Sequence, residues 1–544
     1  MNGGGQDGTP DKGAADMGAP GGDAADAQGV QPAADGPATA EAGVGEWRQL
    51  DLRAPLVAAL LMGGIAFSGA VPAFVALAAA FGAWAALGWV VLGSVVFVGG
   101  SAGLEYVRWR HTRYRIGPER AELHTGLLLV KRRSLARERI RSVDLTAHPL
   151  LRIFGLVKVR IGTGEHHGAG NESTLELHPV TRQEGDRLRR ELLSRTAATD
   201  EEHPDGPLAT LDPRWIRYAP LSFTAPLLGL AAGGAVMQVS EWTGMQQGVI
   251  RWVGGLFSGL AVVWMVLALA AALLVAGVIG SLGLFVEMWW NYRLDRESGG
   301  TLRVQRGLFT SRSISIEERR LRGVELVEPL GVRLAGAARV DAVATGIAEG
   351  ESDKHTDHKT LLPTAPKEVA DAVAARVLRE TQAPTSAARL RPHPPAARGR
   401  RRRWALGPVL AVTGLLALLG VLLTDVLLYV AGAWAVLMLP VAWVLAGDAY
   451  RALGHGLAGK YLVVRSGSLR RSTVALRRDG VIGLTVKQSV FQRRAGLITI
   501  TATTAAGAGA YSAYDAEQGE GLEFAEEAVD GLLGPFLERV PRIP

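Results

Sequence analysis

Two short histidine-rich runs are the residues best suited to metal or acid–base chemistry: His166-His167 and the segment 353–358, Asp-Lys-His-Thr-Asp-His. Imidazole and carboxylate groups together can bind a divalent metal. Both runs fall in the same variable hairpin loop of a repeated unit, among Gly, Glu, Ser and Asp, and the third copy has no histidine there. Such neighbours do not fix a ligand's orientation. We therefore interpret both runs as solvated loops and expect no metal site.

No other residue pattern is typical of an enzyme. The chain has no cysteine, which excludes disulfides, thiolate metal sites and a thiol nucleophile. Serine, histidine and aspartate occur, but no serine lies on a strand–elbow–helix turn, no helix has zinc-binding histidines, and no glycine loop carries a phosphate-binding lysine. We predict no catalytic residues, no cofactor and no enzyme activity.

A set of arginines recurs beside predicted strands and could bind anionic groups. A guanidinium near a bilayer can contact anionic headgroups or an acidic partner segment. The alternative is ordinary solvated charge, or an arginine that locks the fold of its own unit. These candidate binding residues are Arg139, Arg141, Arg152, Arg320, Arg322 and Arg333.

A run of four arginines directly precedes an apolar segment: Arg400, Arg401, Arg402 and Arg403. Basic runs can bind nucleic acid, but this one abuts a predicted membrane helix. We interpret it as an anchor for lipid headgroups and expect no nucleic-acid partner.

Long apolar segments must position these residues. The chain has 544 residues, 48% of them hydrophobic, a net charge of +7 and a mean hydropathy of +0.16, too apolar for an ordinary soluble multidomain protein. A spanning helix needs about 20 apolar residues. Six such runs form three pairs. They lie in 52–104, which holds two helices, in 218–239 and 253–286, joined by a polar connector over 240–247, and in 404–423 and 426–445.

Basic residues beside these runs predict the orientation of the chain. They follow the first pair and flank the third, whereas the tight turns contain only Glu241, Arg251 and Asp425. The positive-inside rule then places both termini and all soluble parts in the cytoplasm. Residues 1–50 carry a net charge of −6, so the remaining chain carries +13. Residues 1–45 are mostly Gly, Ala, Asp and Pro, and we expect a disordered acidic tail.

A soluble unit follows each helix pair, and the three units are repeats. In each unit a glycine precedes an arginine by 26 residues, and this arginine precedes a second glycine by three. The positions are Gly126, Arg152 and Gly155, then Gly307, Arg333 and Gly336, then Gly467, Arg493 and Gly496. Apolar and polar residues alternate within each unit, as over 302–305 and 313–316, which predicts half-buried strands. Each unit closes with a predicted helix, over 181–195, 366–381 and roughly 516–539.

The motifs of the first unit carry a family resemblance. Residues 123–128 read Leu-x-x-Gly-Leu-Leu, 139–143 read basic-Ile-x-Ser-Val, and 150–159 read Leu-x-Arg-x-Phe-Gly-Leu-x-x-Val. This sequence strongly resembles the bacterial pleckstrin-homology (PH) domain of YdbT/YdbS-like membrane proteins. The resemblance implies a partly open β-barrel or sandwich capped by a C-terminal helix, on the cytoplasmic side, and implies no catalysis.

The predicted fold class is therefore multi-domain α+β, with three transmembrane α-helical hairpins, six helices in all, each followed by a PH-like domain with a C-terminal helix. The expected domains are an acidic tail over 1–45, helix pairs over 52–104, 216–288 and 404–447, PH-like domains over 106–196, 290–382 and 449–540, and a basic Pro-rich linker over 383–403.

These features favour a non-enzymatic membrane protein whose PH-like modules bind lipid, peptide or a companion membrane protein. The resemblance implies a small single-module membrane protein as the companion, and a role in envelope stress or in defence against membrane-active peptides. The alternative is a six-helix transporter or exporter with regulatory PH-like domains. The helices carry no charge in mid-span, which does not favour coupled transport.

Overall fold

The computed structural model describes residues 47–126, 131–140, 142–162, 174–193, 206–259, 261–297, 300–346, 359–529 and 531. The predicted acidic tail over 1–45, both histidine-rich runs and Arg141 lie outside these residues, and Arg139 is described by its backbone alone.

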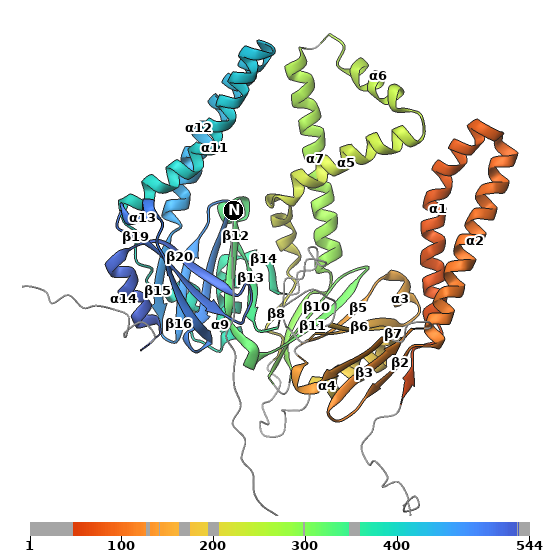
Figure 1. Ribbon diagram of the computed structural model, residues 1–544, viewed down its shortest axis with the longest axis horizontal. Helices are drawn as coiled ribbons and strands as arrows, with labels where there is room; N and C mark the ends of the chain where they lie inside the picture. The colour runs from red at the N-terminus through yellow and green to blue at the C-terminus, as the bar shows by residue number, and fades with distance from the viewer. Residues whose placement is uncertain are drawn as a thin grey trace, which may run out of the picture. The chain divides into compact units, whose positions relative to one another are not determined.

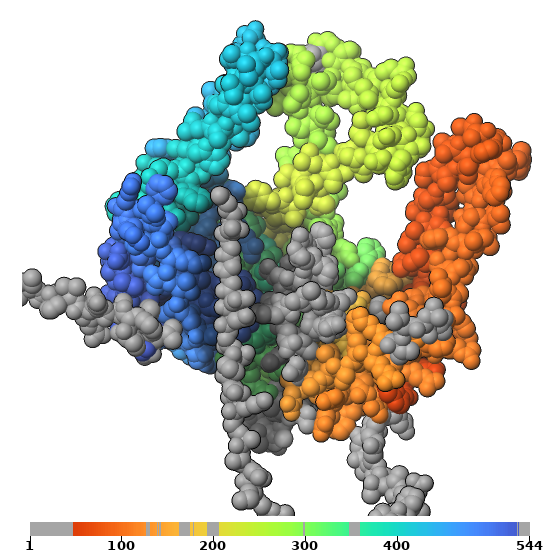
Figure 2. Space-filling view, viewed as in Figure 1, coloured from red at the N-terminus to blue at the C-terminus, as the bar shows by residue number. Residues whose placement is uncertain are grey.

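Five of the described helices are long and apolar enough to cross a membrane. They are α1 (Ala54–Phe81), α2 (Ala83–Arg110), α7 (Val262–Trp289), α11 (Pro395–Leu422) and α12 (Val426–Arg451). A sixth span exists if the 3-10 helix η4 (Pro213–Leu221) and α5 (Thr224–Trp242), bent by 71°, are taken together. Helices α1 and α2 lie side by side (Figures 1 and 2), and α11 packs against α12.

The second helical region differs from the prediction. The segment 240–247 is not a simple connector, because α6 (Gln246–Leu256) begins within it. Helix α7 begins at Val262, so the predicted start at Val253 is wrong. Gly254 and Gly255 lie near the end of α6, and Gly259 has a φ of 93°, a conformation that a helix does not allow. These glycines interrupt an apolar run whose hydropathy alone suggested one continuous helix.

The third region also begins earlier than expected. Residues 395–403, predicted as linker, form the first turns of α11. Proline at the first helical position and a following run of alanine and arginine both favour a helix start there. The rest of the predicted linker contains the short helix α10 (Pro384–Ala387).

The soluble part contains three β-rich modules. Each has three strands, a 3-10 turn, a fourth strand, a short helix, two more strands and a closing helix. Module 1 consists of β2 (Arg113–Ile116), β3 (Arg120–Thr125), β4 (Lys131–Ala136), η1 (Arg137–Arg139), β5 (Ser142–Ala147), α3 (Pro149–Ile153), β6 (Leu156–Gly162), β7 (Thr174–Thr181) and α4 (Arg182–Leu193).

Modules 2 and 3 repeat this order. Module 2 consists of β9 (Arg293–Glu297), β10 (Thr301–Arg306), β11 (Ser311–Glu317), η5 (Glu318–Arg320), β12 (Leu321–Pro329), α8 (Leu330–Leu334), β13 (Ala337–Ala344), β14 (Thr360–Pro366) and α9 (Lys367–Leu378). Module 3 consists of β15 (Gly454–Ala458), β16 (Tyr461–Ser466), β17 (Arg470–Arg477), η7 (Arg478–Gly480), β18 (Val481–Lys487), α13 (Val490–Arg493), β19 (Leu497–Thr504), β20 (Ala510–Glu517) and α14 (Gln518–Ala528). The two-residue strands β1 (Arg48–Gln49) and β8 (Ala209–Thr210) extend two of the sheets.

The modules share their β-sheets. Strand β5 of module 1 pairs with β11 of module 2, which gives a seven-stranded sheet of order β7-β6-β5-β11-β10-β9-β8 (Figure 1). Strand β12 of module 2 pairs with β17 of module 3 in a six-stranded sheet. The outer sheets are β1-β2-β3-β4 and β18-β19-β20. The second half of one module is therefore continuous with the first half of the next.

Both junctions have the same register. Leu145 is opposite Ser313 in the first junction, and Leu326 is opposite Thr473 in the second. Leu145 and Leu326 each precede their module's repeat arginine by seven residues, and Ser313 and Thr473 each follow the turn glycine by six. Register in a sheet is fixed by which side chains must be buried. The repeat therefore includes the way in which one module pairs with the next.

Candidate functional site

The arginines predicted to form an anion-binding face lie mainly at the junctions between modules. Arg320 pairs with Glu317, with Nε 2.9 Å from a carboxylate oxygen, and donates a hydrogen bond of 2.8 Å to the Ile140 carbonyl of module 1. Arg322 lies 3.9 Å from Asp479 of module 3. These two guanidinium groups thus contact the two modules on either side of module 2.

The repeat arginine after each junction strand is linked to the glycine turn of the following module, directly in the first junction and through a carboxylate in the second. Arg152 donates to the carbonyl oxygen of Leu308, the residue after Gly307. Arg333 donates to Asp448 at 2.7 Å, and the same carboxylate accepts from Ser468, the residue after Gly467, at 2.9 Å. The same repeat position therefore serves both junctions, with a backbone carbonyl as its partner in the first and a carboxylate in the second. This arrangement favours the alternative that the arginines lock the protein's own fold.

A partly buried ion-pair network that the sequence did not predict lies in the first junction. Arg189 on α4 donates two hydrogen bonds to the Glu297 carboxylate, at 3.0 and 3.1 Å, and a third to Ser315 at 3.1 Å. Arg303 donates to the same carboxylate at 3.0 Å. Burial alone would raise the pKa of Glu297, but the hydrogen bonds and charges of the two arginines outweigh it and hold the pKa below its ordinary value. The closing helix of module 1 is thereby joined to module 2.

The four arginines at the start of α11 have different surroundings. Arg400 and Arg401 both pair with the buried carboxylate of Asp515, the second at 2.9 Å. The guanidinium of Arg402 lies 3.9 Å from the centre of the Trp443 ring, a cation–π contact. Arg403 is exposed. Two of the four therefore fasten the helix to module 3, and Arg403 faces outward as a lipid anchor requires.

Asp515 belongs to a buried cluster between α11 and module 3. Its carbonyl lies 3.0 Å from His393 Nδ1, and the other ring nitrogen of His393 lies 3.0 Å from His455 Nδ1. Gln492 donates to the Asp515 carboxylate at 2.9 Å. Burial, with smaller effects of His393 and Arg391, lowers the pKa of His455 to about 4. Both imidazoles are therefore neutral near pH 7, and the cluster is a structural joint.

In each module an arginine side chain donates to a carbonyl near the C-terminal end of the closing helix, and the accepting carbonyl has the same helical position in all three. Arg137 donates to the Glu191 carbonyl in module 1, and Arg478 donates to the Glu527 and Ala528 carbonyls in module 3. Module 2 has Glu318 in place of this turn arginine. There Glu318 pairs with Arg296, which donates at 2.8 Å to the Arg376 carbonyl. These contacts satisfy carbonyl groups that have no partner within the helix.

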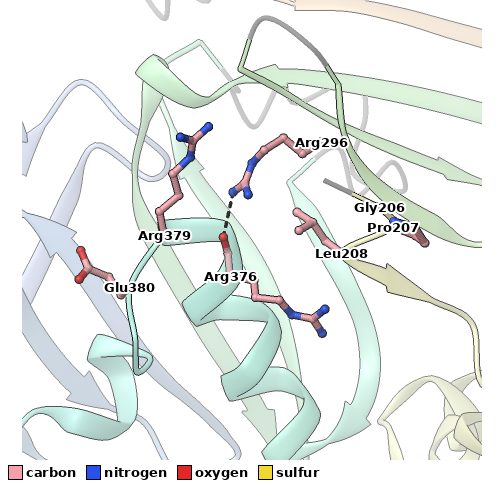
Figure 3. Close-up of a pocket in the computed structure, with 7 residues that line it drawn as sticks. All are labelled: Gly206, Pro207, Leu208, Arg296, Arg376, Arg379 and Glu380. Atoms are coloured by element: carbon pink, nitrogen blue, oxygen red, sulfur yellow. Dashed lines mark hydrogen bonds between the residues drawn. The ribbon is translucent and has the colours of Figure 1, made fainter. Parts of the chain in front are cut away.

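This cap forms one wall of a cavity of about 540 Å³ (Figure 3). The cavity is lined by Gly206, Pro207, Leu208, Arg296, Arg376, Arg379 and Glu380. Arg379 pairs with Glu318 at 3.0 Å, and Glu380 pairs with Lys460 at 2.8 Å. Figure 3 shows the side chain of Arg376 directed away from that of Arg379. The charges around the cavity are therefore largely paired within the protein and do not converge on a ligand.

No group of three or more metal-binding side chains occurs in the part of the chain that the structure describes. The histidine-rich runs were the only candidates from the sequence, and they lie outside that part. The residues that sequence reasoning missed are the carboxylates of Glu297, Asp448 and Asp515. No local signal marks them, because their arginine partners Arg189, Arg333 and Arg400 lie more than 100 residues away in the sequence.

The long apolar helices and the joined modules define a multi-pass membrane protein with a repeated β-rich unit. The family model described as "Bacterial PH domain" matches residues 51–196 and 411–525. The chain is 22% identical over 418 residues to the UPF0699 transmembrane protein YdbT of Bacillus subtilis (strain 168), which covers 73% of this chain and 80% of that protein. No solved structure matches the chain. The predicted resemblance is confirmed: the chain is a multi-pass membrane protein that is similar to YdbT, and two of its regions match bacterial PH domains.

Proposed function

We propose that the protein is a non-enzymatic membrane scaffold whose three PH modules form one continuous cytoplasmic body, each module following a helical hairpin. The observation that carries the proposal is the sharing of sheets. Two antiparallel strand pairs, β5 with β11 and β12 with β17, join adjacent modules. Independent binding domains would each have a separate sheet. Such a body holds several membrane helices and any bound partner in a fixed relation, with a companion membrane protein as the partner.

The use of the arginines supports a scaffold. Arg152, Arg320 and Arg333 each bind a carbonyl or carboxylate of a neighbouring part of the protein. The N–H groups that make these contacts are not available to a phosphate group. We therefore assign these residues to the assembly of the modules.

Contact with lipid involves apolar residues at the ends of the modules nearest the helices. The glycine turn of module 2 is bonded to the end of α7, since the Leu308 amide donates to the Glu287 carbonyl. Large apolar side chains are exposed on these turns and on the short helices: Ile153, Phe309, Leu334, Leu469 and Phe491. Aromatic and aliphatic groups so close to a spanning helix favour insertion into the membrane interface.

Crosslinking mass spectrometry of native membranes tests this function. The proposal expects crosslinks between modules 1 and 2 and between modules 2 and 3 within one chain, together with crosslinks from a module to a second membrane protein. Recovery of the chain alone, with no binding of the purified full chain to anionic liposomes, would contradict it. Repeating the experiment under envelope stress tests the proposed physiological setting, where the amount of crosslinked partner should rise.

The transporter alternative makes a different prediction. The described spanning helices place Glu287 and Asp448 near their ends, where both bind the turn of the following module. These acids therefore serve the scaffold. Proteoliposomes containing the purified chain should show no flux above protein-free vesicles, and measurable flux would favour transport.

A further inference from the structure

The junction between modules occurs twice within the chain, and half of a third junction lies at the end of module 3. Strand β18 is the counterpart of β5 and β12, because each follows a 3-10 turn and precedes the short helix. Strands β5 and β12 each pair with the first half of the next module. Among the residues that the structure describes, β18 pairs only with β19 and forms the edge of its sheet.

The apolar side chains of β18 are exposed where those of its counterparts are covered. Val486 is 38% exposed, whereas the equivalent residues Leu145 and Leu326 are 6% and 3% exposed. Ile482, near the start of the strand, is 67% exposed and stands where β12 has Arg322. An edge strand with free backbone groups and exposed apolar residues is a template for a further strand.

The arginine that locks each junction is also present. Arg152 donates to the glycine turn of the following module, and Arg333 binds Asp448, which in turn accepts from that turn. Arg493 holds the same repeat position, 26 residues after its own turn glycine, and is exposed. Within the described part of the chain its guanidinium has no side-chain or carbonyl partner. The edge therefore has the strand, the apolar residues and the locking cation of a junction.

The opposite edge of the body, β4, is of a different kind. It is the counterpart of β11 and β17, yet it carries three consecutive bases, Lys131, Arg132 and Arg133. Charged residues on an edge strand oppose pairing with another strand. Strand β18 carries a single charge, Lys487. The two edges are thus unequal, and β18 is the one that accepts a strand.

Resting on the proposed scaffold function, we infer that β18 pairs antiparallel with the edge strand of a PH module of a different membrane protein. Continuity with the two internal junctions identifies the partner element as the third strand of such a module, the counterpart of β11. At the internal register a second copy of this chain would place Lys131 opposite Lys487, and like charges directly opposite are destabilising. Thr485 stands where β5 has Asp144 and β12 has Glu325, so no acid meets the bases of β4. The partner strand is neutral or acidic opposite Lys487.

The absence of cysteine makes a site-specific test straightforward. The variant Val486→Cys, labelled in native membranes with a maleimide–benzophenone, is photolysed and its adducts are mapped by mass spectrometry. The control is Thr503→Cys, an exposed position on the central strand β19 of the same sheet. The expected result is an adduct from position 486, absent from position 503, that maps to the third strand of a PH module in another polypeptide.

Three results would overturn the inference: adducts with β4 of a second copy of this chain, adducts with a protein that lacks a PH module, or no polypeptide adduct at position 486. A second variant combines Val486→Lys with Lys487→Cys, which carries the label. The adduct yield should fall at least about tenfold while the chain's abundance is unchanged, because a lysine on an edge strand opposes pairing with another strand. If membrane-wide crosslinking still finds a partner while position 486 gives no adduct, the assignment of β18 as the binding strand is wrong and the proposed scaffold function is retained.

Discussion

Replacing Arg189 by alanine should open the junction between β5 and β11 while each module stays folded. Arg189 is buried and donates three hydrogen bonds across the junction, two of them to Glu297. Breaking a buried ion pair by removing one partner costs about 3–5 kcal/mol. Glu297 is 33% exposed and keeps Arg303, so we expect about 2 kcal/mol, which is roughly a 30-fold change in the opening equilibrium.

Hydrogen exchange of the full chain in nanodiscs measures this opening, because exchange reports local opening free energies strand by strand. Amides of β5 and β11 should exchange about 30-fold faster in Arg189→Ala, and amides of β13 and β14 should be unchanged. The matched control is Arg190→Ala, an exposed residue on the same helix, which should leave all four strands unchanged. Unchanged protection of β5 and β11, or uniform loss across all modules, would refute the account of this junction.

Three further predictions follow from other contacts. Asp448→Asn removes the carboxylate shared by Arg333 and Ser468, so exchange at β17 should rise about tenfold, with Arg451→Gln as the control that leaves it unchanged. Gly307→Ala should cost more than about 2 kcal/mol, because φ is +114° and the new Cβ would lie 1.9 Å from the Thr310 carbonyl oxygen. A thermal midpoint equal to that of the natural chain would contradict this. The pKa of His455 is lowered to about 4 from an ordinary 6.5, so the folded state favours the neutral ring. The contribution of His455 to the free energy of unfolding is therefore complete above pH 6.5 and is lost as pH falls from 6.5 to 4. That loss is about 3 kcal/mol and should appear as a thermal midpoint that falls with pH in the natural chain and falls less in His455→Leu. An equal fall of the midpoint in both proteins would contradict this prediction.

The sequence predicted well those features that depend on local pattern. Apolar runs indicated α1, α2, α11 and α12 because length and hydropathy suffice for a spanning helix. Alternation indicated strands such as β10 and β11, and the glycine–arginine spacing identified the repeat. Helix α6 was missed because hydropathy does not register that glycine can end one helix within an apolar run.

The pairing of strands between modules could not be predicted. A period of two shows that a strand has a buried face, but it does not show which strand lies beside it. The role of the arginines was open for a related reason. Arg333 reaches Asp448, 115 residues away, and Arg189 reaches Glu297, 108 residues away, and neither distance leaves a local signal in one sequence.

The most direct test of shared sheets is disulfide formation between strands of adjacent modules. Thr146 and Arg312 are directly opposite in the β5–β11 pair, and such residues lie about 4.5–5.5 Å apart at Cα, within reach of a disulfide. The double variant Thr146→Cys with Arg312→Cys, oxidised in membranes, should form an intrachain disulfide in high yield. The pair Thr146→Cys with Lys131→Cys, which would link if module 1 closed its own sheet through β4 and β5, should not. A disulfide from the second pair and none from the first would contradict the account.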